Sequence, residues 1–194
     1  MHRPASSAED GRVQRGVRSR AAIVEALVEL VREGELAPTA EQVAERAGVG
    51  ARTVFRHFDD MESLHVEMAA RVEAEFRPLL DAEPPQGGVQ ERARELVKRR
   101  AELFERMTPF QRSANLHRWG RSFLEQDHAK FVRVQRNDLM RVLPELKSAP
   151  APVVEALDLI TSFAAWDRLR GDQGLSRERA EAAVQRAVLA LLKL

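Results

Sequence analysis

The stretch from Thr39 to Phe58 constrains this chain more than any other, because it encodes two short helices joined by a tight turn. Thr39 is a helix N-cap residue, and Gln42 three residues later completes a capping box, in which each side chain satisfies a backbone donor at the helix start. Gly48 is expected to end the first helix, since the residue just past a helix often needs a positive φ. The pattern predicts a helical pair with a fixed turn.

The second helix of this pair has one apolar face and one basic face. Val54 and Phe58 recur at i and i+4, so both should face the core, in a helix that begins at Gly50 or Ala51. The opposite face carries Arg52, Thr53, Arg56 and His57. No acid occurs between Arg46 and Phe58. We predict a helix-turn-helix whose second helix enters the DNA major groove. An ordinary helical hairpin with a solvated basic face is the alternative.

The segment AEQVAERAGVGARTVFRHFDDMESL is similar to the DNA-binding half of the TetR family of bacterial transcriptional repressors, and the similarity runs from about Arg20 to Leu64. This resemblance implies a homodimer that binds a palindromic operator on double-stranded DNA and is released by a small-molecule ligand. The chain departs from the family where Phe55 replaces the usual tyrosine and Met61 the usual lysine, which removes two common phosphate contacts. The DNA-binding residues that we expect are Thr39, Ala51, Arg52, Thr53, Phe55, Arg56 and His57, with Arg18 and Arg20 from the preceding segment.

Composition narrows the functional classes. The chain has 194 residues, of which 44% are hydrophobic, enough for a sizeable core in one domain or two small ones. It has no cysteine, which excludes disulfides, thiolate catalysis and cysteine-based zinc sites. No apolar run approaches the roughly 18 residues of a membrane span, and the N-terminus lacks a signal-peptide core, so we expect a cytoplasmic protein without a membrane partner. The net charge of +1 does not by itself indicate a nucleic-acid partner, so the positions of the charged residues are more informative than their sum.

The helical periodicity predicts an all-α chain of about nine helices in three parts. Residues 1–19 should form a disordered basic arm, residues 20–65 the helix-turn-helix DNA-binding domain, and residues 66–194 a C-terminal ligand-binding and dimerisation bundle. The arm has few large apolar residues and no helical period. Its arginines are either a solvated tail or a source of extra phosphate contacts. The first helix should start at about Ser19, and the fourth should end at Leu79 or Leu80.

The C-terminal part should hold five helices, spanning about 89–107, 108–119, 121–143, 152–170 and 177 to the end. Thr108-Pro109 and Gly120 are the expected breaks among the first three. The last two carry more apolar surface than one packed face needs, which predicts a four-helix bundle with a second copy. A purely intramolecular hairpin is the alternative. The dimer residues that we expect are Val153, Leu157, Ile160, Ala164, Val184, Ala187, Val188 and Leu191.

Aromatic and methionine side chains concentrate between residues 104 and 131, where a helical bundle can form an apolar pocket. A plain hydrophobic core explains them as well. The pocket residues that we expect are Phe104, Met107, Phe110, Leu116, His117, Trp119, Phe123 and Phe131, with Arg118 as a further polar contact; the resemblance implies an inducer there of unknown chemical class.

Catalytic motifs are absent from the sequence. It has no G-x-S-x-G, phosphate-binding glycine loop or H-E-x-x-H, and Glu125 with His128 gives only one of the two E-x-x-H pairs that a di-iron bundle needs. We therefore expect no enzyme, cofactor or metal site. Two competing hypotheses remain: a DNA-binding regulator without a small-molecule inducer, and an enzyme or carrier built on a helical bundle.

Overall fold

The computed structural model describes residues 6–117 and 122–193, with the side chains of residues 13–116 and 125–193. Within these residues there are nine α-helices and no strand, which confirms the predicted all-α class. The helices are α1 (Ser6–Arg32), α2 (Ala40–Arg46), α3 (Ala51–His57), α4 (Met61–Leu80), α5 (Val89–His117), α6 (Ser122–Val142), α7 (Ala151–Ile160), α8 (Phe163–Asp167) and α9 (Arg177–Leu191). The chain divides into two compact units, Met1–Glu75 and Phe76–Leu194, whereas the predicted domain boundary lay after residue 65.

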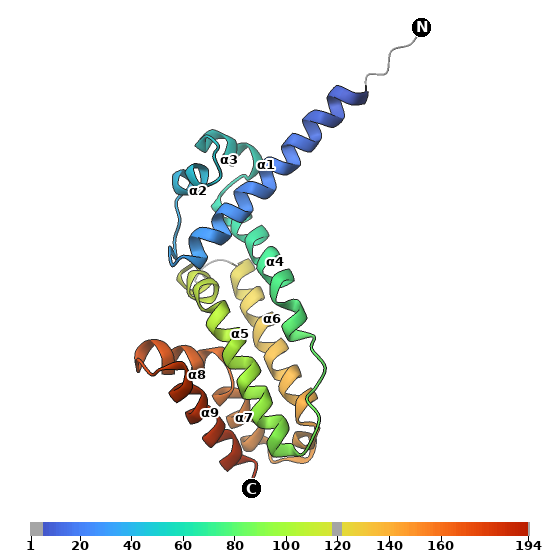
Figure 1. Ribbon diagram of the computed structural model, residues 1–194, viewed down its shortest axis with the longest axis vertical. Helices are drawn as coiled ribbons and strands as arrows, with labels where there is room; N and C mark the ends of the chain where they lie inside the picture. The colour runs from blue at the N-terminus through green and yellow to red at the C-terminus, as the bar shows by residue number, and fades with distance from the viewer. Residues whose placement is uncertain (1–5, 118–121, 194) are drawn as a thin grey trace. The chain divides into compact units, whose positions relative to one another are not determined.

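The first unit is built on α1, against which α2 and α3 pack (Figure 1). Ile23 and Leu27 of α1 are fully buried and form its core with Val43 of α2, Val54 of α3 and Phe58 just after it. The predicted apolar face of the second short helix, formed by Val54 and Phe58, is therefore confirmed. Because this face fixes how α3 is rotated about its axis, it also decides which side chains of α3 point outward.

The predicted turn chemistry is confirmed as well. Thr39 caps α2 through its Oγ1, which accepts from the Gln42 backbone N–H at 3.3 Å, while the Gln42 side chain accepts from the Thr39 N–H at 2.7 Å. Gly48 has a φ of 66°, the left-handed conformation expected after the helix. Asp60 caps α4 by accepting from the Ser63 backbone N–H at 2.7 Å. These local bonds set the ends of α2 and α4.

The predicted disorder of the arm is wrong over residues 6–19, because α1 begins at Ser6 rather than near Ser19; residues 1–5 lie outside the described part. Val13 and Val17 of this extension are 62% and 64% exposed, so packing does not hold it. The helix continues because elongating a formed helix adds a hydrogen bond per residue, whereas nucleation is the costly step. The buried half of α1 supplies that nucleus. The extension projects beyond α2 and α3 of the same unit (Figure 1).

The predicted break at Thr108-Pro109 is also wrong, since α5 runs through Pro109 without interruption. Proline inside a helix costs about 3 kcal/mol, through a lost donor and a clash with the preceding turn. The neighbouring Met107 and Phe110 are only 6% and 5% exposed, and burying two such side chains contributes about 3–6 kcal/mol. Burial therefore offsets the local penalty of the proline.

The single helix predicted over 152–170 is instead divided into α7 and α8 at Thr161 and Ser162. Ser162 adopts an extended conformation, with φ −78° and ψ 162°, and its side chain accepts from the Ala165 backbone N–H at 3.3 Å. A serine N-cap thus starts a new helix inside an apolar run, where the hydrophobic periodicity gave no break.

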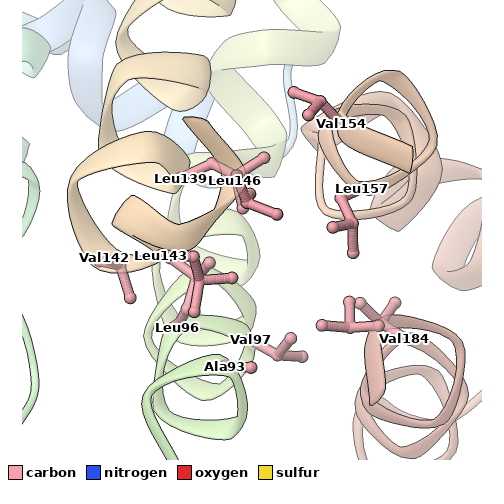
Figure 2. Close-up of a cluster of buried hydrophobic side chains, with 11 residues drawn as sticks. Ala93, Leu96, Val97, Leu139, Val142, Leu143, Leu146, Val154, Leu157 and Val184 are labelled. Carbon is pink, nitrogen blue, oxygen red and sulfur yellow. The ribbon is translucent and has the colours of Figure 1, made fainter. Parts of the chain in front are cut away.

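The second unit has a continuous apolar core between α5, α6, α7 and α9 (Figure 2). Its fully buried members include Leu96 of α5, Leu139 of α6, Leu157 of α7 and Val188 of α9. The core thus brings α9, the last helix of the unit, against α5 together with α6 and α7. One apolar stripe of α7 and one of α9 are already used inside the chain.

Candidate nucleic-acid interface and cavity

The outward face of α3 is basic and has one aromatic ring. Arg52 and Arg56 are exposed, and Phe55 beside them is 51% exposed, while Val54 on the other side is 1% exposed. Thr53 is half-buried. The structure therefore presents two guanidinium groups, with no acid on the same helix, on the surface where a major groove would be met.

His57 lies at the end of α3 and is less available than the arginines. Its side chain is half-buried, and its Nε2 is buried without a hydrogen-bond partner among the described residues. A buried Nε2 cannot reach a base or a phosphate while it keeps this position. Its proposed supporting contact to DNA therefore needs a change of side-chain conformation.

Arg20 was expected to touch DNA, and the structure gives it partners within the first unit while its side chain remains 40% exposed. Its Nε lies 3.0 and 3.2 Å from the two carboxylate oxygens of Glu67 in α4, and its Nη1 donates to the backbone carbonyl of His57. Its guanidinium also stacks over the Phe58 ring, 4.1 Å from the centroid. Arg20 thus joins α1, the end of α3 and α4. The sequence could not separate this role from a phosphate contact, because Glu67 is distant in the chain.

Arg46 likewise holds helices together. It forms ion pairs with Glu33 at 2.6 Å and with Glu29 at 3.4 Å, both on α1. The hydrogen bond from Arg46 holds the pKa of the Glu33 carboxyl below its ordinary value. Of the three arginines between Arg46 and Phe58, only Arg52 and Arg56 therefore contribute unpaired positive charge to the surface of the first unit.

The other expected DNA-contacting residues lie at helix starts or on the extension of α1. Arg18 is exposed on that extension, and Thr39 is exposed at the start of α2. Ala51 is half-buried at the first position of α3. The Thr39 hydroxyl accepts a backbone proton, so its own proton is free for a second acceptor.

The expected dimer residues fall into two groups. Leu157, Val184 and Val188 are 0%, 4% and 0% exposed and lie in the core of the second unit, so a second copy cannot touch them without opening that core. The remaining residues are half-buried or exposed at the edges of α7, α8 and α9: Val153, Ile160, Ala164, Ala187 and Leu191. Only this second group is placed where it could meet another chain.

The expected ligand-pocket residues do not all meet. Phe104, Met107 and Phe110 are core residues with 2%, 6% and 5% exposure, and Leu116 is 59% exposed. The side chains of His117, Arg118, Trp119 and Phe123 lie outside the described residues. Among the five predicted residues whose side chains are described, Phe131 lines the largest described cavity, which has a volume of about 680 Å³.

This cavity lies between α6, α7 and α8, and most of its wall was missed by the sequence reasoning. Phe131 and Phe163 form an edge-on aromatic pair in the wall, with ring centroids 6.5 Å apart. Leu159 and Val132 add exposed apolar surface, and Gln135 and Asp158 add polar groups. Phe163 and Leu159 were not among the expected pocket residues, because the break at Ser162 that places them here was not predicted.

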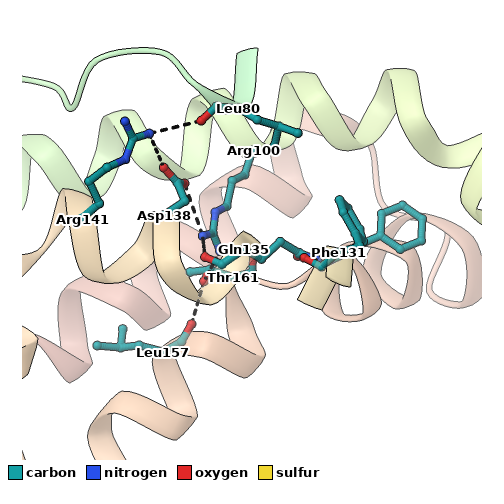
Figure 3. Close-up of polar contacts among 9 residues, drawn as sticks. Leu80, Arg100, Phe131, Gln135, Asp138, Arg141, Leu157 and Thr161 are labelled. Carbon is teal, nitrogen blue, oxygen red and sulfur yellow. Dashed lines mark hydrogen bonds and ion pairs between the residues drawn. The ribbon is translucent and has the colours of Figure 1, made fainter. Parts of the chain in front are cut away.

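A buried polar network includes Gln135, which lines the cavity (Figure 3). The Arg100 side chain of α5 is 5% exposed and donates to the Thr161 carbonyl at 2.9 Å, to its hydroxyl at 2.8 Å, and to the Gln135 carbonyl. Gln135 in turn accepts from the Phe163 backbone N–H at 2.9 Å. Desolvation lowers the pKa of the Arg100 guanidinium, and Asp138 at 3.4 Å opposes this shift. The network fixes the cavity wall to α5.

The described residues hold no group of three or more histidine, cysteine or acidic side chains that could bind a metal ion. None of the helices described is both long and apolar enough to cross a membrane.

Comparison with known proteins agrees with this geometry. Residues 23–68 match the family model described as bacterial regulatory proteins, tetR family. A tetR-family transcriptional regulator from Streptomyces coelicolor superposes with a TM-score of 0.68 at 17% identity, over 90% of this chain and 80% of that one. A TetR transcriptional regulator from Rhodococcus sp. RHA1 gives 0.56 at 23% identity, over 90% and 94%.

At these identities the structural likenesses establish the fold, while the family model covers the residues of the helix-turn-helix. The matched proteins are described as bacterial regulatory proteins or transcriptional regulators. No curated protein matches the chain.

Proposed function

We propose that this chain, a DNA-binding transcriptional regulator of the TetR family, acts as a homodimeric repressor that binds a palindromic operator and is released by a small-molecule ligand. In this proposal two copies hold their α3 helices about one DNA turn apart, roughly 34 Å, so that each reads one half-site. The paired copies use the outer edges of α7, α8 and α9, since the inner faces of α7 and α9 are buried within the chain.

The observation that carries the proposal is the pair of exposed arginines on α3. Arg52 and Arg56 lie at i and i+4 of a helix without acids, and the helix is held by Val54 and Phe58 in the core. A guanidinium can bind guanine bidentately or pair with a phosphate. The first 60 residues hold nine arginines and ten acids, so their net charge is close to zero. This balance does not weaken the proposal, because acids of the same unit are paired with Arg20 and Arg46.

Ligand release is supported by the cavity of about 680 Å³ in the second unit, which is large enough for a small organic molecule. The ligand must bind one arrangement of the dimer better than the other, because equal binding shifts nothing. To weaken operator binding a hundredfold, its preference for the released form must be about 2.7 kcal/mol.

The first prediction tests the DNA surface. Arg56→Ala should weaken binding to a duplex enriched from a random library by about 1–3 kcal/mol, because a base or phosphate contact is lost. Binding is measured by gel-shift titration, and the association of copies by sedimentation. The dimer should be unchanged, since Arg56 lies on α3 in the first unit, whereas the proposed pairing uses α7, α8 and α9.

Arg133→Ala is the matched control, because Arg133 is an exposed arginine of α6 and its loss removes the same charge from the second unit. Equal affinities of Arg56→Ala and Arg133→Ala would remove Arg56 from the interface. A regulator without an inducer is the second candidate, favoured if a thermal-shift screen of metabolites finds no ligand for the wild-type protein.

A further inference from the structure

The exposed aromatic ring of α3, Phe55, was expected among the DNA-contacting residues, but no contact has yet been assigned to it. Phe55 is the only large hydrophobic side chain that is exposed between residues 20 and 75, all of which the structure describes. A single exposed apolar side chain needs no explanation by itself. The position of this one, among the residues that would face DNA, is what makes it informative.

Helical geometry places the ring and the two arginines together. Successive residues are rotated by about 100°, so Arg52, Phe55 and Arg56 lie within an arc of about 100° on one side of α3. Val54 and Phe58, at 1% and 2% exposure, fix the opposite side in the core. An approach to the major groove that lets both guanidinium groups reach bases or phosphates therefore brings the Phe55 ring toward the base edges.

The chemistry of the groove then limits what the ring can meet. A phenyl ring has no donor or acceptor, and covering a polar base edge without a hydrogen bond is unfavourable. Guanine, adenine and cytosine present mainly such polar groups in the major groove, whereas thymine presents a C5-methyl group. The thymine methyl is the one apolar partner among the four bases.

We infer that Phe55 is a specificity-determining residue that selects thymine in each operator half-site by packing on its C5-methyl group. This inference rests on the proposed DNA-binding function and deepens it, because it names a base. The family's usual tyrosine carries a hydroxyl that can bind a phosphate, and its loss here leaves a purely apolar contact. Arg52 and Arg56 supply charge and hydrogen bonds, and Phe55 supplies discrimination by shape.

The test removes only the methyl group. In a duplex enriched from a random library by the wild-type protein, each thymine of the half-site is replaced in turn by deoxyuridine, which keeps the base pair and every polar atom. At one position the wild-type affinity should fall about fourfold, the value for one buried methyl-sized group. Replacement in both half-sites should reduce it about fifteenfold if two copies bind alike.

The variants show whether the ring is responsible. Phe55→Ala should bind the thymine and deoxyuridine duplexes equally, and Phe55→Leu should keep part of the preference because it retains apolar bulk. Arg52→Ala should bind both duplexes more weakly but keep the full preference for thymine. Helix content and thermal midpoint should stay unchanged in Phe55→Ala, since the side chain is half-exposed.

Three results separate the outcomes. Equal wild-type affinity for thymine and deoxyuridine at every position, as expected if the ring packs on the sugar–phosphate backbone, overturns the inference. A preference for thymine that persists in Phe55→Ala overturns it too. Failure to enrich any duplex from the library contradicts DNA binding itself, which is the proposed function and not this inference.

Discussion

Two arginines of the first unit, Arg20 and Arg18, differ in role although both were expected to touch DNA. Arg20 binds the Glu67 carboxylate, the carbonyl of His57 and the ring of Phe58, which belong to different segments of the unit. Arg18, two residues earlier in the same helix, is exposed. A helix turns by about 100° per residue, so two positions two residues apart face different surroundings.

At this scale we predict that Arg20→Ala destabilises the protein whereas Arg18→Ala does not. The Glu67 pair is about 40% exposed on both sides and contributes at most about 1 kcal/mol. The hydrogen bond to the His57 carbonyl adds about 1 kcal/mol or more, because the donor is charged. Urea unfolding followed by circular dichroism should show a loss of about 1–2 kcal/mol for Arg20→Ala. A loss of equal size in Arg18→Ala would contradict the distinction.

At the scale of elements, α5, α6 and the junction of α7 with α8 are joined by one guanidinium (Figure 3). Arg100 donates to Thr161 and Gln135, and Asp138 lies beside it at 3.4 Å. Asp138 also accepts from Arg141 at 2.9 Å, and Arg141 donates to the Leu80 carbonyl at the end of α4. A chain of polar contacts therefore runs from the cavity wall to the last residue of α4.

We predict that Arg100→Met lowers the free energy of unfolding of the second unit by about 3–5 kcal/mol. The substitution leaves the buried carbonyls of Gln135 and Thr161 without this donor, and each loss costs about 1–3 kcal/mol. Urea unfolding can be followed by the fluorescence of Trp166, which is 3% exposed. Thr161→Val, which removes only a hydroxyl, should lose about 1 kcal/mol. Equal losses in the two variants would show that the guanidinium does not hold these elements.

The elements also show what sequence reasoning can and cannot reach. Local chemistry predicted the capping box of Thr39 and the turn at Gly48, because each depends on residues three or fewer positions away. It failed at Pro109, where tertiary burial of Phe110 and Met107 outweighs a local penalty. The missed break in the apolar run of α7 and α8 places Leu159 and Phe163 in the cavity wall, where the hydrophobic periodicity did not predict them.

The same limit applies to the DNA surface. The basic face of α3 could be predicted because it depends only on the spacing of residues within one helix. Arg52 and Arg56 are exposed, as expected. The roles of Arg20 and Arg46 depend on ion pairs with Glu67 and Glu33, and helical spacing alone does not predict such pairs. Helical spacing thus predicted the exposed basic face of α3, but the expected DNA-contacting set also included Arg20, which pairs with Glu67 within the unit.

At the scale of the whole molecule, the number of copies on the operator can be read from the salt dependence of binding. Each phosphate contact lowers the slope of log K against log salt concentration by about 0.9. Arg18 belongs to the extension of α1, which projects beyond α2 and α3 (Figure 1). Its side chain is exposed, so its guanidinium can reach a phosphate. We predict that Arg18→Ala makes the slope shallower by about 1.8, because a homodimer loses one contact from each copy.

Gel-shift titrations between about 50 and 200 mM salt measure this slope. Over this range the affinity of a protein with several phosphate contacts falls strongly. Arg133→Ala, which removes an exposed arginine from the second unit, should leave it unchanged. A slope identical to that of the wild type would exclude the extension from the phosphate contacts. A change of only about 0.9 would mean that one extension per complex touches DNA, which a symmetric pair of copies on a palindrome does not allow.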